Sequence, residues 1–122
     1  MGDDTTGSLH IGVWIAATPE AVYAFASDPA ELPRWAAGLA DPSLSDAVVE
    51  FVPRNEFGVL DHTVRLPSGE AVYNPMRVIP GETGCEVVFT LRRRSGVTDA
   101  EFEDDAAAVT ADLETLRGLL ES

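Results

Sequence analysis

The 122-residue sequence is poor in cysteine, histidine and basic residues, and each shortage excludes a class of protein. One cysteine, Cys85, cannot form an internal disulfide, and no Cys/His cluster offers a structural metal site. Eight Lys and Arg stand against 21 Asp and Glu, so a net charge of −13 excludes nucleic acids and anionic membranes as partners. We expect no metal, no cofactor and a reducing, cytoplasmic location.

Long apolar runs are also missing, and we expect no secretory leader. The first eight residues, MGDDTTGS, are polar and acidic, without the positive end and apolar stretch of a signal sequence. No segment is apolar over the length that spans a bilayer, so we expect no membrane insertion. With 45% hydrophobic and 24% charged residues, the chain fits one domain, placed at 8–122 behind a flexible lead-in over 1–7.

Two hydrophobic periods indicate an α+β domain. Apolar residues alternate from Leu9 to Ile15, which is the period of a half-buried strand. Over 102–120 they recur every three or four residues, as on one face of a helix, and Thr98 with Glu101 forms a capping box that starts this helix. A curved antiparallel sheet wrapped on one long C-terminal helix would bury both apolar faces.

Start signals after the first strand predict two short helices. Thr18 can cap a helix whose first turn contains Pro19. Asp28, with Glu31 three positions later, predicts a second start. Residues 38–46 contain Gly, Pro and Ser without any period, which is typical of a connector.

Further strands complete a predicted sheet of about five to six strands. The apolar patterns place them at 47–52, 57–66, 70–79 and 84–93. Turn-rich segments at 67–69 and 80–83 are short enough to form antiparallel hairpins. Pro75 lies inside one of these strands and removes a ladder donor, so it marks an edge or a bulge where the register can slip.

Hairpin register predicts which polar residues meet on the apolar face. The expected cross-strand pairs are His62–Asn74, Leu60–Met76, Asn74–Phe89 and Met76–Val87. His62, Asn74 and Phe89 would then form one row. His62 can act there as a general acid or base near neutral pH, with Asn74 orienting it or polarising a substrate carbonyl.

The alternative for His62 is a buried histidine that its neighbour satisfies. We favour it, because buried polar groups normally occur as hydrogen-bonded pairs and no nucleophile or carboxylate is clearly placed beside this one. Asp61 precedes His62 but should point to the opposite face of the strand. It is therefore a poor catalytic partner.

Inward-facing residues are candidates for lining a ligand pocket, although they can equally fill a core. The candidate ligand-binding residues are Phe25, Trp35, Leu60, His62, Asn74, Met76, Phe89 and Arg93. Arg93 either binds an acidic ligand head or pairs with the acidic first turns of the last helix. Outward apolar residues, including Trp14 and Phe57, suggest a dimer or partner surface.

Three stretches together carry a family resemblance. They are 15–23 (IAATPEAVY), Asp28-Pro29 with 33–35 (PRW), and the terminal helix, and the likeness spans about nine-tenths of the chain. They resemble the START-like superfamily, also called SRPBCC, and in particular bacterial members labelled polyketide cyclase/dehydrase. The resemblance implies a helix-grip fold with a cavity between sheet and last helix. The chain is shorter than usual, so part of the cavity wall is missing or comes from a second subunit.

Three functions stay open from the sequence. The first is binding of an apolar or aromatic small molecule, lipid- or polyketide-like, in that cavity. The second, implied by the resemblance, is a polyketide cyclase/dehydratase-type enzyme in which His62 moves a proton and Asn74 or Arg93 steadies an enolate. The third is a protein-interaction module with a filled core, in which the outer apolar surface binds a partner.

Overall fold

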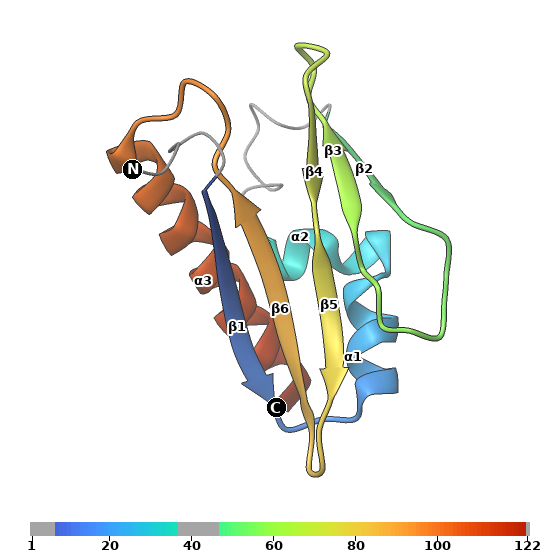
Figure 1. The fold of residues 1–122 in the computed structure, drawn as a ribbon. Helices are drawn as coiled ribbons and strands as arrows, with labels where there is room; N and C mark the ends of the chain where they lie inside the picture. Colours follow the sequence, from blue (N-terminus) through green and yellow to red (C-terminus); the bar gives the residue numbers. More distant parts are fainter. Residues whose placement is uncertain (1–6, 37–46, 122) are drawn as a thin grey trace.

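The computed structural model describes residues 7–36 and 47–121, and it has the predicted α+β helix-grip fold (Figure 1). Its elements are β1 (Ser8–Ile15), α1 (Pro19–Ala26), the 3-10 turn η2 (Pro29–Glu31), α2 (Leu32–Trp35), β2 (Val48–Phe51), β3 (His62–Arg65), β4 (Ala71–Asn74), β5 (Met76–Pro80), β6 (Cys85–Arg92) and α3 (Asp99–Glu121). The predicted lead-in, except Gly7, and the predicted connector lie outside the described residues.

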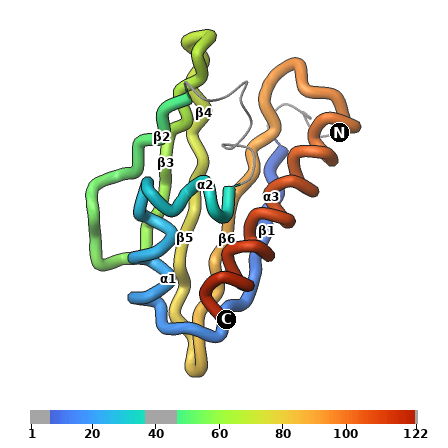
Figure 2. The backbone as a smooth tube through the Cα atoms, turned by 180° about the vertical axis from the view of Figure 1, so that it is seen from behind, coloured from blue at the N-terminus to red at the C-terminus, as the bar shows by residue number. Residues whose placement is uncertain are grey.

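The strands form two antiparallel sheets, and the helices cover one side of both. Within the described ranges each sheet has three strands, in the orders β1-β6-β5 and β2-β3-β4. Figures 1 and 2 show α1, α2 and α3 on the same side, with α3 running along β1 and β6. None of the described helices is long and apolar enough to cross a membrane.

The helix starts that the sequence predicts are confirmed. The Thr18 hydroxyl accepts from the Ala21 N–H at 3.1 Å, and the Asp28 carboxylate accepts from the Ala30 N–H at 3.0 Å. At the start of α3, Thr98 and Glu101 exchange backbone-to-side-chain hydrogen bonds of 2.9 and 3.1 Å. These caps satisfy N–H groups that a helix terminus otherwise leaves unpaired.

The strand predicted over 70–79 divides at Pro75 into β4 and β5, which belong to different sheets. The prediction of a single strand over 70–79 was therefore wrong. Pro75 has no N–H to donate, but its carbonyl still accepts from the Thr90 N–H at 2.9 Å. The next N–H, of Met76, donates to the Asp61 carboxylate at 2.9 Å instead of to a strand. The bend at Pro75 thus joins the two sheets.

The first hairpin has the predicted register, and the second is shifted by two residues. His62 pairs with Asn74, as expected. Met76 pairs with Phe89 and not with Val87, so the predicted Met76–Val87 and Asn74–Phe89 pairs are wrong. The ladder continues to Pro80 and Cys85, and the turn closes tightly through a 2.8 Å hydrogen bond from the Gly81 N–H to the Gly84 carbonyl. A two-residue shift preserves the facing of every side chain.

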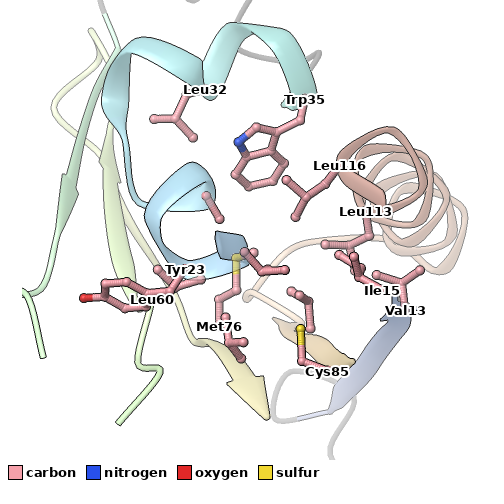
Figure 3. Packing of buried hydrophobic residues seen from close by; sticks show 14 residues of the cluster. Val13, Ile15, Tyr23, Leu32, Trp35, Leu60, Met76, Cys85, Leu113 and Leu116 are labelled. Carbon is pink, nitrogen blue, oxygen red and sulfur yellow. The ribbon is translucent and has the colours of Figure 1, made fainter. Parts of the chain in front are cut away.

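The core lies between the sheets and the helices (Figure 3). Its fully buried side chains include Ile15, Val22, Met76, Leu113 and Leu116. Cys85 is also fully buried, as predicted, and burial, aided by the charge of Glu20, raises the pKa of its thiol. A raised thiol pKa disfavours the reactive thiolate, which agrees with a packing role for this cysteine.

Candidate functional site

A cavity of about 200 Å³ lies between the two sheets, α2 and α3. Its wall consists of Leu32, Trp35, Ala36, Val49, His62, Val64, Asn74, Phe89, Val109, Asp112 and Leu113. Most of these side chains are apolar, and a few polar groups converge among them, which is the usual composition of a small-molecule site. An apolar cavity of about 150 Å³ can hold benzene, so this one has room for a ligand of about one to two rings.

The predicted row of His62, Asn74 and Phe89 does meet at this cavity, although Phe89 pairs with a different strand residue than expected. The centroid of the His62 ring lies 6.1 Å from that of Phe89 and 5.2 Å from that of Phe51. Because the chain bends at Pro75, β3 and β4 supply one wall and β6 supplies another. Val109 and Leu113, one turn apart on α3, contribute to the helix side.

His62 is buried and neutral. A carbonyl can only accept, so Nδ1 carries the hydrogen and donates it to the Leu60 carbonyl at 2.9 Å. Nε2 then holds a lone pair, which accepts a long hydrogen bond of 3.4 Å from the Asn74 amide. Burial lowers the pKa of His62, and the Leu60 carbonyl and the Asp61 charge oppose this only in part. The imidazole is therefore a base and acceptor at neutral pH.

Trp35 lines the cavity and has an unusual buried polar group. Its side chain is 5% exposed, and the indole N–H has no hydrogen-bond partner in the part of the chain that the structure describes. Figure 3 shows the nitrogen on the edge of the ring nearer to Leu32, which also lines the cavity. A buried donor without an acceptor costs about 1–3 kcal/mol, so such a group needs an explanation.

The eight candidate ligand residues divide between the cavity wall, the core and positions outside both. Trp35, His62, Asn74 and Phe89 line the cavity. Leu60 and Met76 are almost fully buried in the core beside it. Phe25 is partly buried against the same core, with the Arg34 guanidinium 5.5 Å from its ring centroid.

Arg93 is outside this wall. Its guanidinium pairs with Asp99 at 2.6 Å, donates to the Val97 carbonyl at 2.8 Å and lies 5.5 Å from the centroid of the Phe102 ring. The alternative in which Arg93 pairs with the acidic first turn of α3 is confirmed. A guanidinium that already has these partners is a poor anchor for a ligand head.

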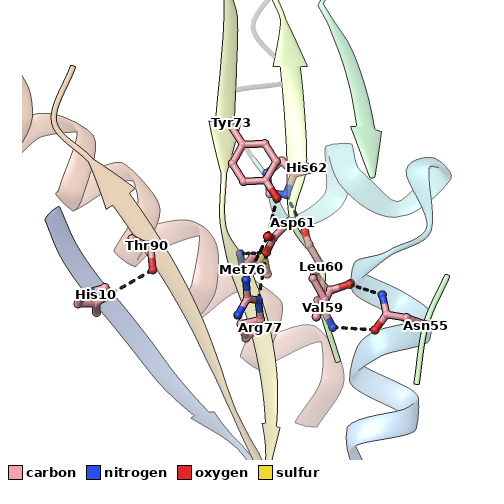
Figure 4. Close-up of polar contacts among 10 residues, drawn as sticks. All are labelled: His10, Asn55, Val59, Leu60, Asp61, His62, Tyr73, Met76, Arg77 and Thr90. Atoms are coloured by element: carbon pink, nitrogen blue, oxygen red, sulfur yellow. Dashed lines mark hydrogen bonds and ion pairs between the residues drawn. The ribbon is translucent and has the colours of Figure 1, made fainter. Parts of the chain in front are cut away.

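Sequence reasoning missed the role of Asp61, which points outward from His62 but is only 5% exposed. Figure 4 shows its carboxylate accepting from the Tyr73 hydroxyl at 2.6 Å, the Met76 N–H at 2.9 Å and the Arg77 guanidinium at 3.1 and 3.2 Å. Burial by itself would raise the pKa of Asp61, but these hydrogen bonds and the charge of Arg77 outweigh it and lower the pKa. The alternation of side chains along the strand predicts that Asp61 points outward. No local sequence pattern predicts that its carboxylate is buried.

The wall limits the chemistry that the cavity can perform. No Ser, Thr, Cys or Lys occurs among the described residues that line the cavity, so none of these contributes a nucleophile of those types. Among the described residues no group of three or more His, Cys, Asp or Glu is placed to hold a metal ion. The available actions are hydrogen bonding by Trp35 and Asn74 and proton transfer at His62 or Asp112.

Comparison with known proteins places the chain in a fold class. No family model matches the sequence, and no curated protein matches it. A solution structure of an AHSA1-like protein from Rhizobium etli is similar at 19% identity, with a TM-score of 0.63 over 96% of this chain and 83% of that one. The Aha1 dimer from Colwellia psychrerythraea is similar at 16% identity, with a TM-score of 0.60 over 94% and 96%.

A further crystal structure, of a protein from Chromobacterium violaceum, has 13% identity and a TM-score of 0.63 over 94% of this chain and 97% of that one. The agreement over nearly whole chains establishes the helix-grip fold. At these identities the structural similarity does not indicate a ligand, a reaction or a partner for this chain.

Proposed function

We propose that the protein binds a small, neutral, mostly apolar molecule, aromatic or acyl, in the cavity between the sheets and α3. The observation that carries this proposal is a mostly apolar cavity of about 200 Å³ whose wall includes His62, Asn74 and Trp35; the buried indole N–H of Trp35 has no partner among the described residues. A carbonyl or ether oxygen on the ligand would satisfy that donor or the Asn74 amide. The SRPBCC resemblance supports the same location.

The charges of the wall favour a neutral ligand over a carboxylate. Among the described lining residues Asp112 is the one acid, and burial favours the neutral form of His62. No Lys or Arg occurs in the part of the wall that the structure describes. A ligand carboxylate would lose its hydration without gaining a cationic partner, which is unfavourable.

The test compares acetophenone with benzoate, two probes of similar size and different charge. Indole N–H resonances in 15N–1H spectra distinguish Trp35 from Trp14 once Trp14→Phe has assigned them. We expect acetophenone to shift the Trp35 resonance with saturation, and benzoate to bind at least tenfold more weakly. Trp35→Phe keeps a ring but removes the N–H, and should weaken acetophenone binding by about five- to tenfold.

Absence of any saturable shift at Trp35 or His62 with either probe would contradict the binding proposal. Equal binding of benzoate would contradict its charge selectivity. Trp14, which is 46% exposed and outside the cavity wall, should show no saturable shift and serves as the internal control.

A polyketide cyclase/dehydratase-type reaction is a second candidate, favoured by the lone pair of His62 Nε2 at the cavity wall. His62 would then remove a proton from a bound carbonyl compound, and Asn74 would stabilise the enolate. His62→Gln should abolish turnover of such a substrate and leave acetophenone binding within a fewfold. Loss of binding and of folding stability together would instead indicate a packing role.

The cytoplasmic location stays a prediction.

A further inference from the structure

An exposed phenylalanine is held in place by an ordered loop on the edge of the molecule away from the cavity. Phe57, between β2 and β3, is 82% exposed. The side chain of Asn55 binds the loop on both sides of it. Its oxygen accepts from the Phe57 N–H at 3.0 Å and the Val59 N–H at 3.1 Å, and its nitrogen donates to the carbonyls of Pro53 and Val59 at 3.1 and 3.0 Å. Figure 4 shows the two bonds to Val59.

The loop is also tied to α1 and β5. The Asn55 N–H donates to the Tyr23 hydroxyl at 3.0 Å, and the Gly58 carbonyl accepts from the Val78 N–H at 2.8 Å. Gly58 has φ of 72°, and a Cβ there would lie 2.3 Å from the Val78 carbonyl oxygen, so only glycine permits this approach. Phe57 is thus presented to solvent by a preorganised backbone, which reduces the entropy lost on binding.

A groove of about 590 Å³ lies directly beside Phe57. Its apolar surface comes from Pro19, Tyr23, Val78 and Pro80, together with Phe57 itself. It shares no residue with the wall of the cavity described above. A projecting aromatic ring next to a partly apolar groove can serve as an anchor and a pocket at a protein interface.

Charges of both signs surround the groove. Glu20, Arg54 and Glu56 line it, and none of them forms an ion pair within the described part of the chain. The Arg54 guanidinium lies 5.2 Å from the centroid of the Tyr23 ring. A second copy turned by a two-fold axis can bring Arg54 opposite an acid of the same set, so the charges of this surface can complement those of a second copy.

We propose that this surface is a homodimer interface in which Phe57 of each copy enters the groove of the other. Arg54 then pairs with Glu56 of the partner subunit, and the reverse pair forms by symmetry. Such reciprocal burial removes two aromatic rings from water in one contact. The interface is independent of the proposed ligand cavity, so either proposal can fail alone.

The test is sedimentation equilibrium of the full chain at about 0.15 M salt, where charges more than about 8 Å apart are largely screened and the net charge of −13 opposes association less. We expect a concentration-dependent dimer. Phe57→Ala should weaken it on the order of thirtyfold, as loss of a central aromatic anchor does. Because Phe57 is 82% exposed, the same change should leave the melting temperature nearly unchanged.

Two comparisons make the test specific. Trp14→Ala removes another exposed aromatic ring, 46% exposed on β1, and should leave dimerisation unchanged. Arg54→Glu and Glu56→Arg should each weaken the dimer, whereas the double variant restores the opposite-charge pairs and much of the affinity. A monomer up to about 1 mM, a dimer unaffected by Phe57→Ala, or a dimer lost with Trp14→Ala alone would each overturn the proposal.

Discussion

Asp61 and His62 are adjacent in sequence, yet the polar clusters around their side chains differ in how fully their hydrogen-bonding groups are satisfied. Asp61, on the outer face, accepts hydrogen bonds from two side chains and one backbone N–H. His62, on the inner face, has one hydrogen bond of 2.9 Å and one long one of 3.4 Å, and it borders a cavity lined also by Trp35, whose indole N–H has no partner among the residues that the structure describes. A saturated cluster stabilises the fold, whereas a partly satisfied one leaves capacity for a ligand.

The outer cluster should dominate stability. Asp61→Ala leaves the Met76 N–H without its acceptor at the bend beside Pro75, where no strand can replace it. We expect a loss of about 2–3 kcal/mol in the free energy of unfolding, measured by urea denaturation. Tyr73→Phe removes only a hydroxyl from a half-exposed ring and should cost much less. A loss below about 1 kcal/mol for Asp61→Ala would contradict the structural role of this carboxylate.

The two clusters should also differ in the pH range over which they affect stability. The pKa of Asp61 is lowered from its ordinary value of 3.8, so its contribution is present above that pH and is lost as pH falls below it. The pKa of His62 is lowered from 6.5, so the unfolded chain binds a proton first and stability begins to fall already below pH 6.5.

The unfolding free energy should therefore decline in two stages on acidification. We expect His62→Gln to remove the part that begins near pH 6.5, and Asp61→Asn the part that begins near pH 3.8. The measurement is urea unfolding at a series of pH values. If stability rose between pH 6.5 and 5 in the native protein, or if His62→Gln left that decline intact, the neutral buried imidazole would be the wrong description.

The smallest effect is expected at Asn74. Its hydrogen bond to His62 is long, at 3.4 Å, and the group is only partly buried, so Asn74→Ala should cost about 0.5 kcal/mol of stability. The same change removes an amide from the cavity wall and should weaken acetophenone binding more than it lowers stability. A large stability loss with unchanged binding would assign Asn74 to the fold alone.

Local patterns were sufficient for much of the fold. The apolar alternation up to Ile15, the capping residues Thr18 and Asp28, and the His62–Asn74 register are confirmed because each depends on neighbours in sequence or across one short turn. The second hairpin was misread because its turn includes Gly84 rather than Pro80. The length and position of a turn cannot be predicted from the sequence when several Pro and Gly residues occur together.

The sequence by itself determined the order of elements, which side chains face inward and the shortage of basic residues, because periodicity and composition are properties of the chain alone. Only the tertiary structure decided that α2 and α3 leave a cavity beside His62, that Asp61 is buried while pointing outward, and that Phe57 projects next to a groove. Each of these features depends on how segments far apart in sequence pack against one another. The local period of a strand or helix does not specify that packing.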